Sequence, residues 1–162
     1  MENQIIKPIK KTSAATIAVT LIDVFSALML TVAWFLPVVS FGPLSVSYLD
    51  AISLSGDDGE MAVIYWAFII ISAVSILWAA FPKLWAAIVG IIYSFAPIII
   101  CLSQVLLWAA EGISLGIGAI FMSLFSVLIL VLSIVKLVLT ILDMSRVRTY
   151  NAAIQPPPMG MY

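Results

Sequence analysis

The sequence has very few of the residues that carry most enzyme chemistry. It contains no histidine and a single cysteine, Cys101, among 162 residues. One cysteine cannot form a disulfide within the chain, and the common zinc sites need several cysteine or histidine ligands. A histidine-based catalytic triad is excluded as well. Because no group of residues pairs a nucleophile with a base, we expect a non-enzymatic protein without a metal or other cofactor.

Charged residues are also scarce. They make up 9% of the chain, whereas hydrophobic residues make up 64%. A soluble domain carries about 25% charged residues, so this chain could not cover itself with a wettable surface. The composition therefore predicts an integral membrane protein surrounded by lipid, and nothing in it indicates nucleic-acid binding.

Four apolar segments are long enough to cross a membrane, since a spanning helix needs about 20 residues. They cover residues 14–36, 61–81, 84–110 and 113–142. Residues 37–60 form the longest connection between them, residues 1–13 a basic N-terminal segment, and residues 143–162 a Pro-rich tail. The predicted fold is an all-α, polytopic four-transmembrane-helix bundle. The prolines of the tail suit either recognition by a partner or a disordered end.

Basic residues occur on only one side of this four-span arrangement. The residues on that side are Lys7, Lys10, Lys11, Lys83, Lys136, Arg146 and Arg148. The two connections on the other side carry only acids: Asp50, Asp57, Asp58, Glu60 and Glu111. Because basic residues are retained in the cytoplasm, this distribution predicts a cell-membrane protein with both termini cytoplasmic.

Aromatic residues lie near the predicted ends of the spans. Those near the outer ends are Trp34, Tyr65, Trp66 and Trp108, and those near the inner ends are Trp78 and Trp85. Amphipathic rings favour the level of the lipid headgroups. We therefore interpret these six residues as two interfacial belts.

One carboxylate lies inside the first apolar segment. Asp23 falls about 13 Å into that segment, where an ionised side chain costs about 2.5–3.5 kcal/mol. The residues on its helical face include Thr16, Thr20, Ala27 and Trp34. Small and polar residues mark the protein-facing side of a membrane helix. Lys136 in the last segment lies at a similar depth from the same side. Since the first and last helices of a bundle are commonly neighbours, we predict an intramembrane Asp23–Lys136 contact.

Other roles for Asp23 stay open at this point. Its carboxyl could be protonated and satisfied locally by Thr20 or Ser26, because burial favours the neutral acid. Lys136 could instead extend to the cytoplasmic surface. Asp23 could also handle a proton or another cation during transport.

The third segment contains a proline and a buried amide. Pro97 predicts a kink, because it removes a backbone donor and crowds the preceding turn. Gln104 is expected to face the bundle and to form a hydrogen bond across it. Gly90 and Ser94 form a small-xxx-small pair that allows close approach of another helix. These features suit helix packing, and a permeation path is the alternative.

Glycines gather at the start of the fourth segment, which reads EGISLGIGA. Gly112 and Gly116 have the GxxxG spacing, and Ser114 and Gly118 repeat it. On a membrane helix this spacing allows close packing within the bundle or against another subunit.

The first connection alternates apolar and small polar residues on both sides of a Gly-Pro pair, as VVSFGPLSVSYLD. This pattern predicts a short β-hairpin over the outer face. The following SLSGDDGE carries Asp57, Asp58 and Glu60, whose spacing does not match a calcium-binding loop. A solvated turn is the favoured interpretation of these acids.

The stretch WFLPVVSFGPLSVS resembles small bacterial four-span membrane proteins, in which a Trp-x-x-Pro boundary precedes a Ser/Gly-rich outer loop. The resemblance implies the layout of most of the chain and no particular activity. An acid in the first of four helices is also similar to the small multidrug-resistance exporters. This chain departs from them in its long first loop and extended fourth span, so Asp23 is not assigned their proton-coupling role.

These features favour a non-catalytic accessory or scaffold protein that packs beside a larger membrane complex or forms a homo-oligomer. Its expected partners are membrane lipids and another membrane subunit or a second copy of itself. A small transporter or channel using Asp23 is the first alternative. An immunity-type protein that shields a membrane from a toxin is the second.

Overall fold

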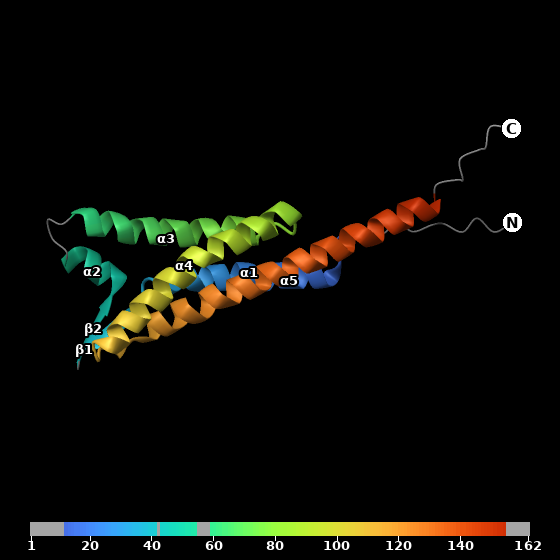
Figure 1. Ribbon diagram of the computed structural model, residues 1–162. Helices are drawn as coiled ribbons and strands as arrows, with labels where there is room; N and C mark the ends of the chain where they lie inside the picture. Colours follow the sequence, from blue (N-terminus) through green and yellow to red (C-terminus); the bar gives the residue numbers. More distant parts are fainter. Residues whose placement is uncertain (1–11, 42, 55–58, 155–162) are drawn as a thin grey trace, which may run out of the picture.

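The computed structural model describes residues 12–41, 43–54 and 59–154 of the chain, and it is mostly helical (Figure 1). The helices are α1 (Ala14–Ala33), α2 (Tyr48–Leu54), α3 (Gly59–Ala79), α4 (Leu84–Ala110) and α5 (Ile117–Ile154). The strands are β1 (Pro37–Phe41), β2 (Leu44–Ser47) and β3 (Ser114–Leu115).

Three helices are long and apolar enough to cross a membrane. They are α1, α4 and the part of α5 that covers residues 117–153, whereas the apolar stretch of α3, residues 65–79, is shorter. The outward faces of these helices carry large apolar side chains, among them Leu21 on α1, Ile99 on α4 and Val138 on α5. A chain with such surfaces is a membrane protein, because lipid is the solvent that they match.

These three helices and α3 pack side by side in a closed order. α5 contacts α1 and α4 along their lengths, and α3 contacts the same two helices. The first and last long helices, α1 and α5, are therefore neighbours, as predicted. The buried face of α1 repeats every three or four residues and is mostly small or polar, comprising Thr16, Thr20, Asp23, Ser26, Ala27, Leu30 and Ala33. The polar face of α1 therefore packs against the protein, and its apolar face is exposed on the outside of the bundle.

The sheet lies at one end of the bundle (Figure 1). β1 and β2 form the predicted antiparallel hairpin, in which Phe41 pairs with Leu44. β1 also pairs with β3, which follows α4, so β1 is the central strand in the order β2-β1-β3. The hairpin therefore does not stand alone, since the connection between α4 and α5 adds the third strand that a marginal two-stranded ribbon needs.

A short helix that the sequence pattern did not predict, α2, follows the hairpin. Ser47 precedes this helix and accepts a hydrogen bond from the Asp50 N–H (3.2 Å), while the Ser47 N–H donates to the Asp50 carboxylate (2.8 Å). This reciprocal pair is a capping box. The Ser47 backbone N–H and then its hydroxyl hold the pKa of Asp50 below its usual value. The cap is therefore complete at neutral pH and is lost only in acid.

The last helix differs from its predicted bounds at both ends. It begins at Ile117, after β3, and continues to Ile154 instead of ending near residue 142. No glycine or proline occurs between Gly118 and Pro156, so nothing in the chain stops the helix earlier. Its last turns project beyond the bundle (Figure 1). The tail prolines, the N-terminal lysines and the Asp57–Asp58 pair lie outside the described residues.

Candidate functional site

A buried ion pair joins α1 and α5, the first and last long helices of the chain. The Lys136 ammonium donates to Asp23 Oδ2 at 2.5 Å, and each side chain is 1% exposed. The same ammonium donates to the backbone carbonyl of Ala79 at 3.1 Å. Three helices, α1, α3 and α5, therefore meet at one cation.

The surrounding hydroxyls do not satisfy Asp23. Thr20 donates to the Thr16 carbonyl (2.7 Å), and Ser26 donates to the Ile22 carbonyl (2.8 Å). Both side chains thus bond to their own helix, so the alternative of local satisfaction by Thr20 or Ser26 is wrong. Lys136 likewise turns into the bundle instead of extending along the helix, in line with the tilt of helical side chains toward the N-terminus.

A cavity of about 10 Å³ lies beside the ion pair. It is lined by Asp23, Ser75, Gly90, Tyr93 and Ser133, among others. Asp23 Oδ1 and Ser133 Oγ are buried there and have no hydrogen-bond partner in the described chain. The volume admits about one water molecule. The unpartnered Asp23 oxygen therefore lies beside a space that is large enough for a single water molecule and for nothing larger.

α4 approaches α5 through the predicted small residues. Ser94 is 1% exposed, and a Cβ placed on Gly90 would lie 2.7 Å from Ser133 Oγ. Gly90 thus lets the two helices meet next to the ion-pair cavity, as small residues do on membrane helices.

Gly90→Val should lower the stability of the protein by about 1–2 kcal/mol, because the added methyl groups meet Ser133 across a packed interface. Ser133→Ala should recover part of that loss, since it removes the atom that is met first. The measurement is the midpoint of chemical unfolding in mild detergent. Ile92→Val is the control, because Ile92 is 68% exposed. An equal loss in Gly90→Val and Ile92→Val would contradict the close approach.

Of the remaining features predicted for α4, only Gln104 differs from its predicted role. The helix continues through Pro97, which is buried and lines a cavity of about 20 Å³ together with Trp34 and Ser72. Gln104 is partly buried, but its Oε1 accepts no hydrogen bond from the described residues. The predicted bond of Gln104 across the bundle is therefore absent from this part of the chain. Cys101 is a free thiol and is buried, so it packs like a small hydrophobic side chain, as predicted.

The GxxxG interpretation of Gly112 and Gly116 is wrong, because neither residue lies in a helix. Gly112 has a positive φ of 71° in the turn after α4, where glycine is favoured. Gly116 follows β3, and its N–H donates to the Val38 carbonyl at 2.8 Å. A Cβ on Gly118 would lie 2.7 Å from the Leu36 carbonyl oxygen. Gly116 and Gly118 therefore allow close approach to the β1 backbone and the end of α1.

Trp34 is part of the core and not of an interfacial belt. It is 1% exposed, its indole N–H donates to Ser72 Oγ (2.8 Å), and its ring lies 4.7 Å from that of Tyr48. These two contacts join the C-terminal end of α1 to α2 and α3 at the sheet end of the bundle. The helical face that Trp34 shares with Asp23 was the signal in the sequence that could have placed it inside.

No group of three or more His, Cys, Asp or Glu residues that could hold a metal ion is found in residues 12–41, 43–54 and 59–154. Comparison of the chain with protein-family models, curated proteins and solved structures found no match. A proposal for its function therefore depends on the geometry of the bundle.

Proposed function

We propose that the protein is a non-catalytic integral membrane protein in which α1, α3, α4 and α5 cross the cell membrane, with both termini in the cytoplasm. In this proposal it acts as an accessory or scaffold subunit that packs beside a larger membrane complex or assembles with copies of itself. The length of α3 supports a fourth crossing, since its 21 residues extend about 30 Å. α1 begins and α5 ends on the side opposite the sheet (Figure 1), which supports a common side for the termini.

The ion pair is the observation that carries this proposal. Both charges bond to atoms of the bundle itself, at the point where α1, α3 and α5 meet. The cavity beside them has room for about one water molecule. It is far smaller than the pockets of about 300 Å³ or more that bind small molecules. Such an arrangement supports a structural role for Asp23 and Lys136, namely to fix the relative positions of the helices.

The outer surfaces of the helices support a role in assembly. The described elements outside the long helices are a small sheet and a seven-residue helix. The accessible surface of the molecule is therefore chiefly the apolar faces of α1, α4 and α5, which fit either lipid or the helices of another membrane subunit.

Single cysteines can test the proposed crossing and orientation. Cys101 is buried, so a cysteine placed at exposed Ser53 on α2 or at exposed Thr149 on α5 supplies the reactive thiol. We expect a membrane-impermeant maleimide to label Ser53→Cys in intact cells and Thr149→Cys only after lysis. Labelling of both variants, or of Thr149→Cys alone, in intact cells would contradict the proposed arrangement.

Native mass measurement tests the accessory role. After gentle extraction we expect the 17.5 kDa chain in a stoichiometric complex with a larger membrane protein or as a defined homo-oligomer. A monomer that persists across several mild detergents and in lipid nanodiscs would contradict assembly.

One observation favours a small transporter or channel as the second candidate. Asp23 Oδ1 is buried without a partner among the described residues, beside a cavity that borders α1, α3, α4 and α5. Proton flux into liposomes that is lost in Asp23→Asn would support this function over the accessory role.

A further inference from the structure

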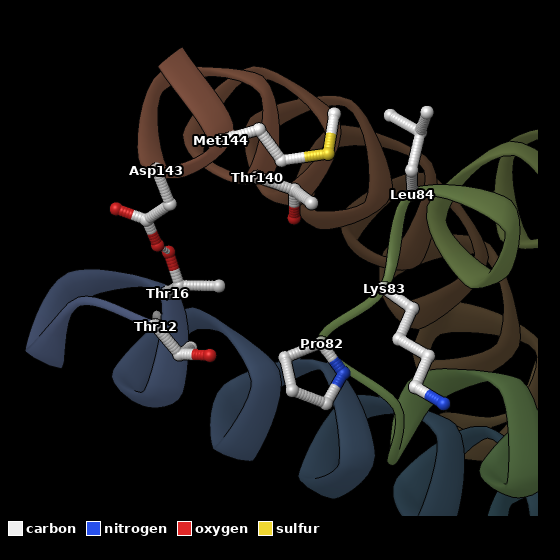
Figure 2. Close-up of a pocket in the computed structure, with 8 residues that line it drawn as sticks. All are labelled: Thr12, Thr16, Pro82, Lys83, Leu84, Thr140, Asp143 and Met144. Atoms are coloured by element: carbon white, nitrogen blue, oxygen red, sulfur yellow. Dashed lines mark hydrogen bonds between the residues drawn. The ribbon is translucent and has the colours of Figure 1, made fainter. Parts of the chain in front are cut away.

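A pocket of about 320 Å³ lies at the end of the bundle opposite the sheet, and Figure 2 shows the residues that line it. It is formed where the start of α1, the turn between α3 and α4, and α5 come together. Thr16, Pro82, Lys83, Leu84, Thr140 and Asp143 contribute to its lining. Its α5 residues lie one to two turns along the helix from Lys136, and none of its lining residues belongs to the cavity at the ion pair.

A buried hydroxyl without a partner faces this pocket. Thr140 is 7% exposed, and its Oγ1 forms no hydrogen bond with the described residues. In Figure 2 the Thr140 hydroxyl points toward the space above Pro82. The hydroxyl of Thr16 across the pocket is already engaged, because it donates to Asp143 Oδ2 at 2.7 Å. A buried polar group is costly when unpaired, so the Thr140 hydroxyl indicates a polar ligand.

The N-terminus of α4 opens at the same place. Lys83 is its N-cap residue, and its side chain forms no capping hydrogen bond. The first N–H groups of α4 have no acceptor within the helix, and the helix dipole adds a partial positive charge there. Lys83 is exposed and adds a positive charge to this end of the bundle, although its side chain is directed away from Thr140 (Figure 2). N–H donors, a dipole and a cation together favour an anion.

The carboxylate of Asp143 does not cancel this preference. Its Oδ2 accepts hydrogen bonds from the Ser13 N–H (2.9 Å) and the Thr16 hydroxyl (2.7 Å), so it caps the start of α1. Arg146 also interacts with it electrostatically. The negative charge of Asp143 is therefore offset by the N-terminus of α1 and by Arg146, whereas no carboxylate among the described residues caps α4 in this way.

We infer that this pocket binds the phosphate group of a membrane phospholipid. The phosphate accepts hydrogen bonds from the first N–H groups of α4 and from the Thr140 hydroxyl, and the positive charge of Lys83 attracts it. Leu84 and Met144 give the pocket an apolar wall for the glycerol backbone and the start of an acyl chain. This inference rests on the proposed function, which places this end of the bundle at the inner membrane surface.

The aromatic residues beside the pocket support a position at the headgroup level. The rings of Trp78 and Trp85 lie edge to face at 5.7 Å, and Phe81 lies 5.8 Å from Trp85. These three residues flank the turn that carries Pro82 and Lys83. Tryptophan is enriched at the membrane–water interface, where lipid phosphates are also found.

Native mass spectrometry of the full-length protein with added lipid tests the inference. We expect the protein to retain phosphatidylglycerol and to be stabilised by it, whereas diacylglycerol, which lacks the phosphate, does neither. The double variant Thr140→Val and Lys83→Gln should bind phosphatidylglycerol at least about tenfold more weakly, because it loses the hydroxyl donor of Thr140 and the positive charge of Lys83. The matched control is Thr149→Val with Arg148→Gln, which makes the corresponding changes on exposed turns of α5.

Stability without lipid separates a loss of binding from misfolding. Thr140→Val removes an unpaired hydroxyl and should unfold at the same or a higher temperature than the unmodified protein in lipid-free detergent. Equal phospholipid retention by the double variant and its control would overturn the inference, as would equal stabilisation by diacylglycerol. Glycerol phosphate binding as tightly as the lipid would also overturn it, in favour of a soluble phosphate.

Cysteine labelling at Ser53 and Thr149 tests the membrane arrangement independently. If both thiols label as proposed and phospholipid binding is unspecific, only the lipid site is wrong. If the labelling pattern fails, the proposed function is wrong whatever the lipid result.

Discussion

Lys136→Met should destabilise the protein by about 3–5 kcal/mol, because it leaves the buried carboxylate of Asp23 without its counter-ion. Methionine keeps much of the volume and shape of the lysine side chain, so lost packing contributes little. The substitution also removes the hydrogen bond to the Ala79 carbonyl. The free energy of unfolding is measured by titration with a denaturing detergent from mild micelles. Arg148→Met, on an exposed turn of α5, is the control and should change stability by less than about 0.5 kcal/mol.

Combined substitutions decide whether the loss belongs to the pair. Asp23→Leu together with Lys136→Met should be much more stable than Lys136→Met alone, since a buried pair replaced by apolar residues is often neutral. The charge exchange Asp23→Lys with Lys136→Asp should likewise recover stability that either single reversal loses. Losses that simply add in both double variants would show that the two residues act independently.

The ion pair could be predicted because helix geometry converts sequence position into depth. A helix rises by a fixed amount per residue, so Asp23 and Lys136 could be placed at similar levels before their partners were known. The polar face of α1 could be predicted for a related reason, since Thr16, Thr20 and Asp23 recur at helical spacing. The β1–β2 hairpin followed from alternation across the Gly-Pro pair.

Features that depend on contacts between distant segments could not be predicted in this way. β3 has two residues, which is too short for a periodic signal, and it exists because β1 offers an edge to it. The start of α5 at Ile117 follows from that pairing. Gly112 and Gly116 lie before this start, so their assignment to a helix was wrong. The buried position of Trp34 depends on Ser72 and Tyr48, which belong to other elements. The pocket at the start of α4 likewise joins three elements that are far apart in the sequence.

The glycines at the start of α5 carry the second large expected effect. Gly116→Ala should destabilise the protein by about 2–3 kcal/mol, because the new Cβ overlaps the backbone of β1. That Cβ would lie 2.8 Å from the Pro37 carbonyl carbon and still closer to its oxygen. Gly116 cannot move away freely, since its N–H donates to the Val38 carbonyl at 2.8 Å. The backbone atoms that it meets, unlike the side chain of Ser133 opposite Gly90, have no rotamer to change.

Gly112→Asn is the matched control, because it separates steric overlap from backbone strain. Gly112 has a positive φ, but a Cβ added there would meet no atom of the described residues within 4 Å, and asparagine tolerates this conformation. Its expected cost is less than about 1 kcal/mol, measured in the same detergent titration. If Gly112→Asn cost as much as Gly116→Ala, the loss would not be explained by steric overlap with β1, because Gly112 has no such overlap. If only Gly116→Ala is costly, the close approach of β1 to the start of α5 holds the sheet against the helices.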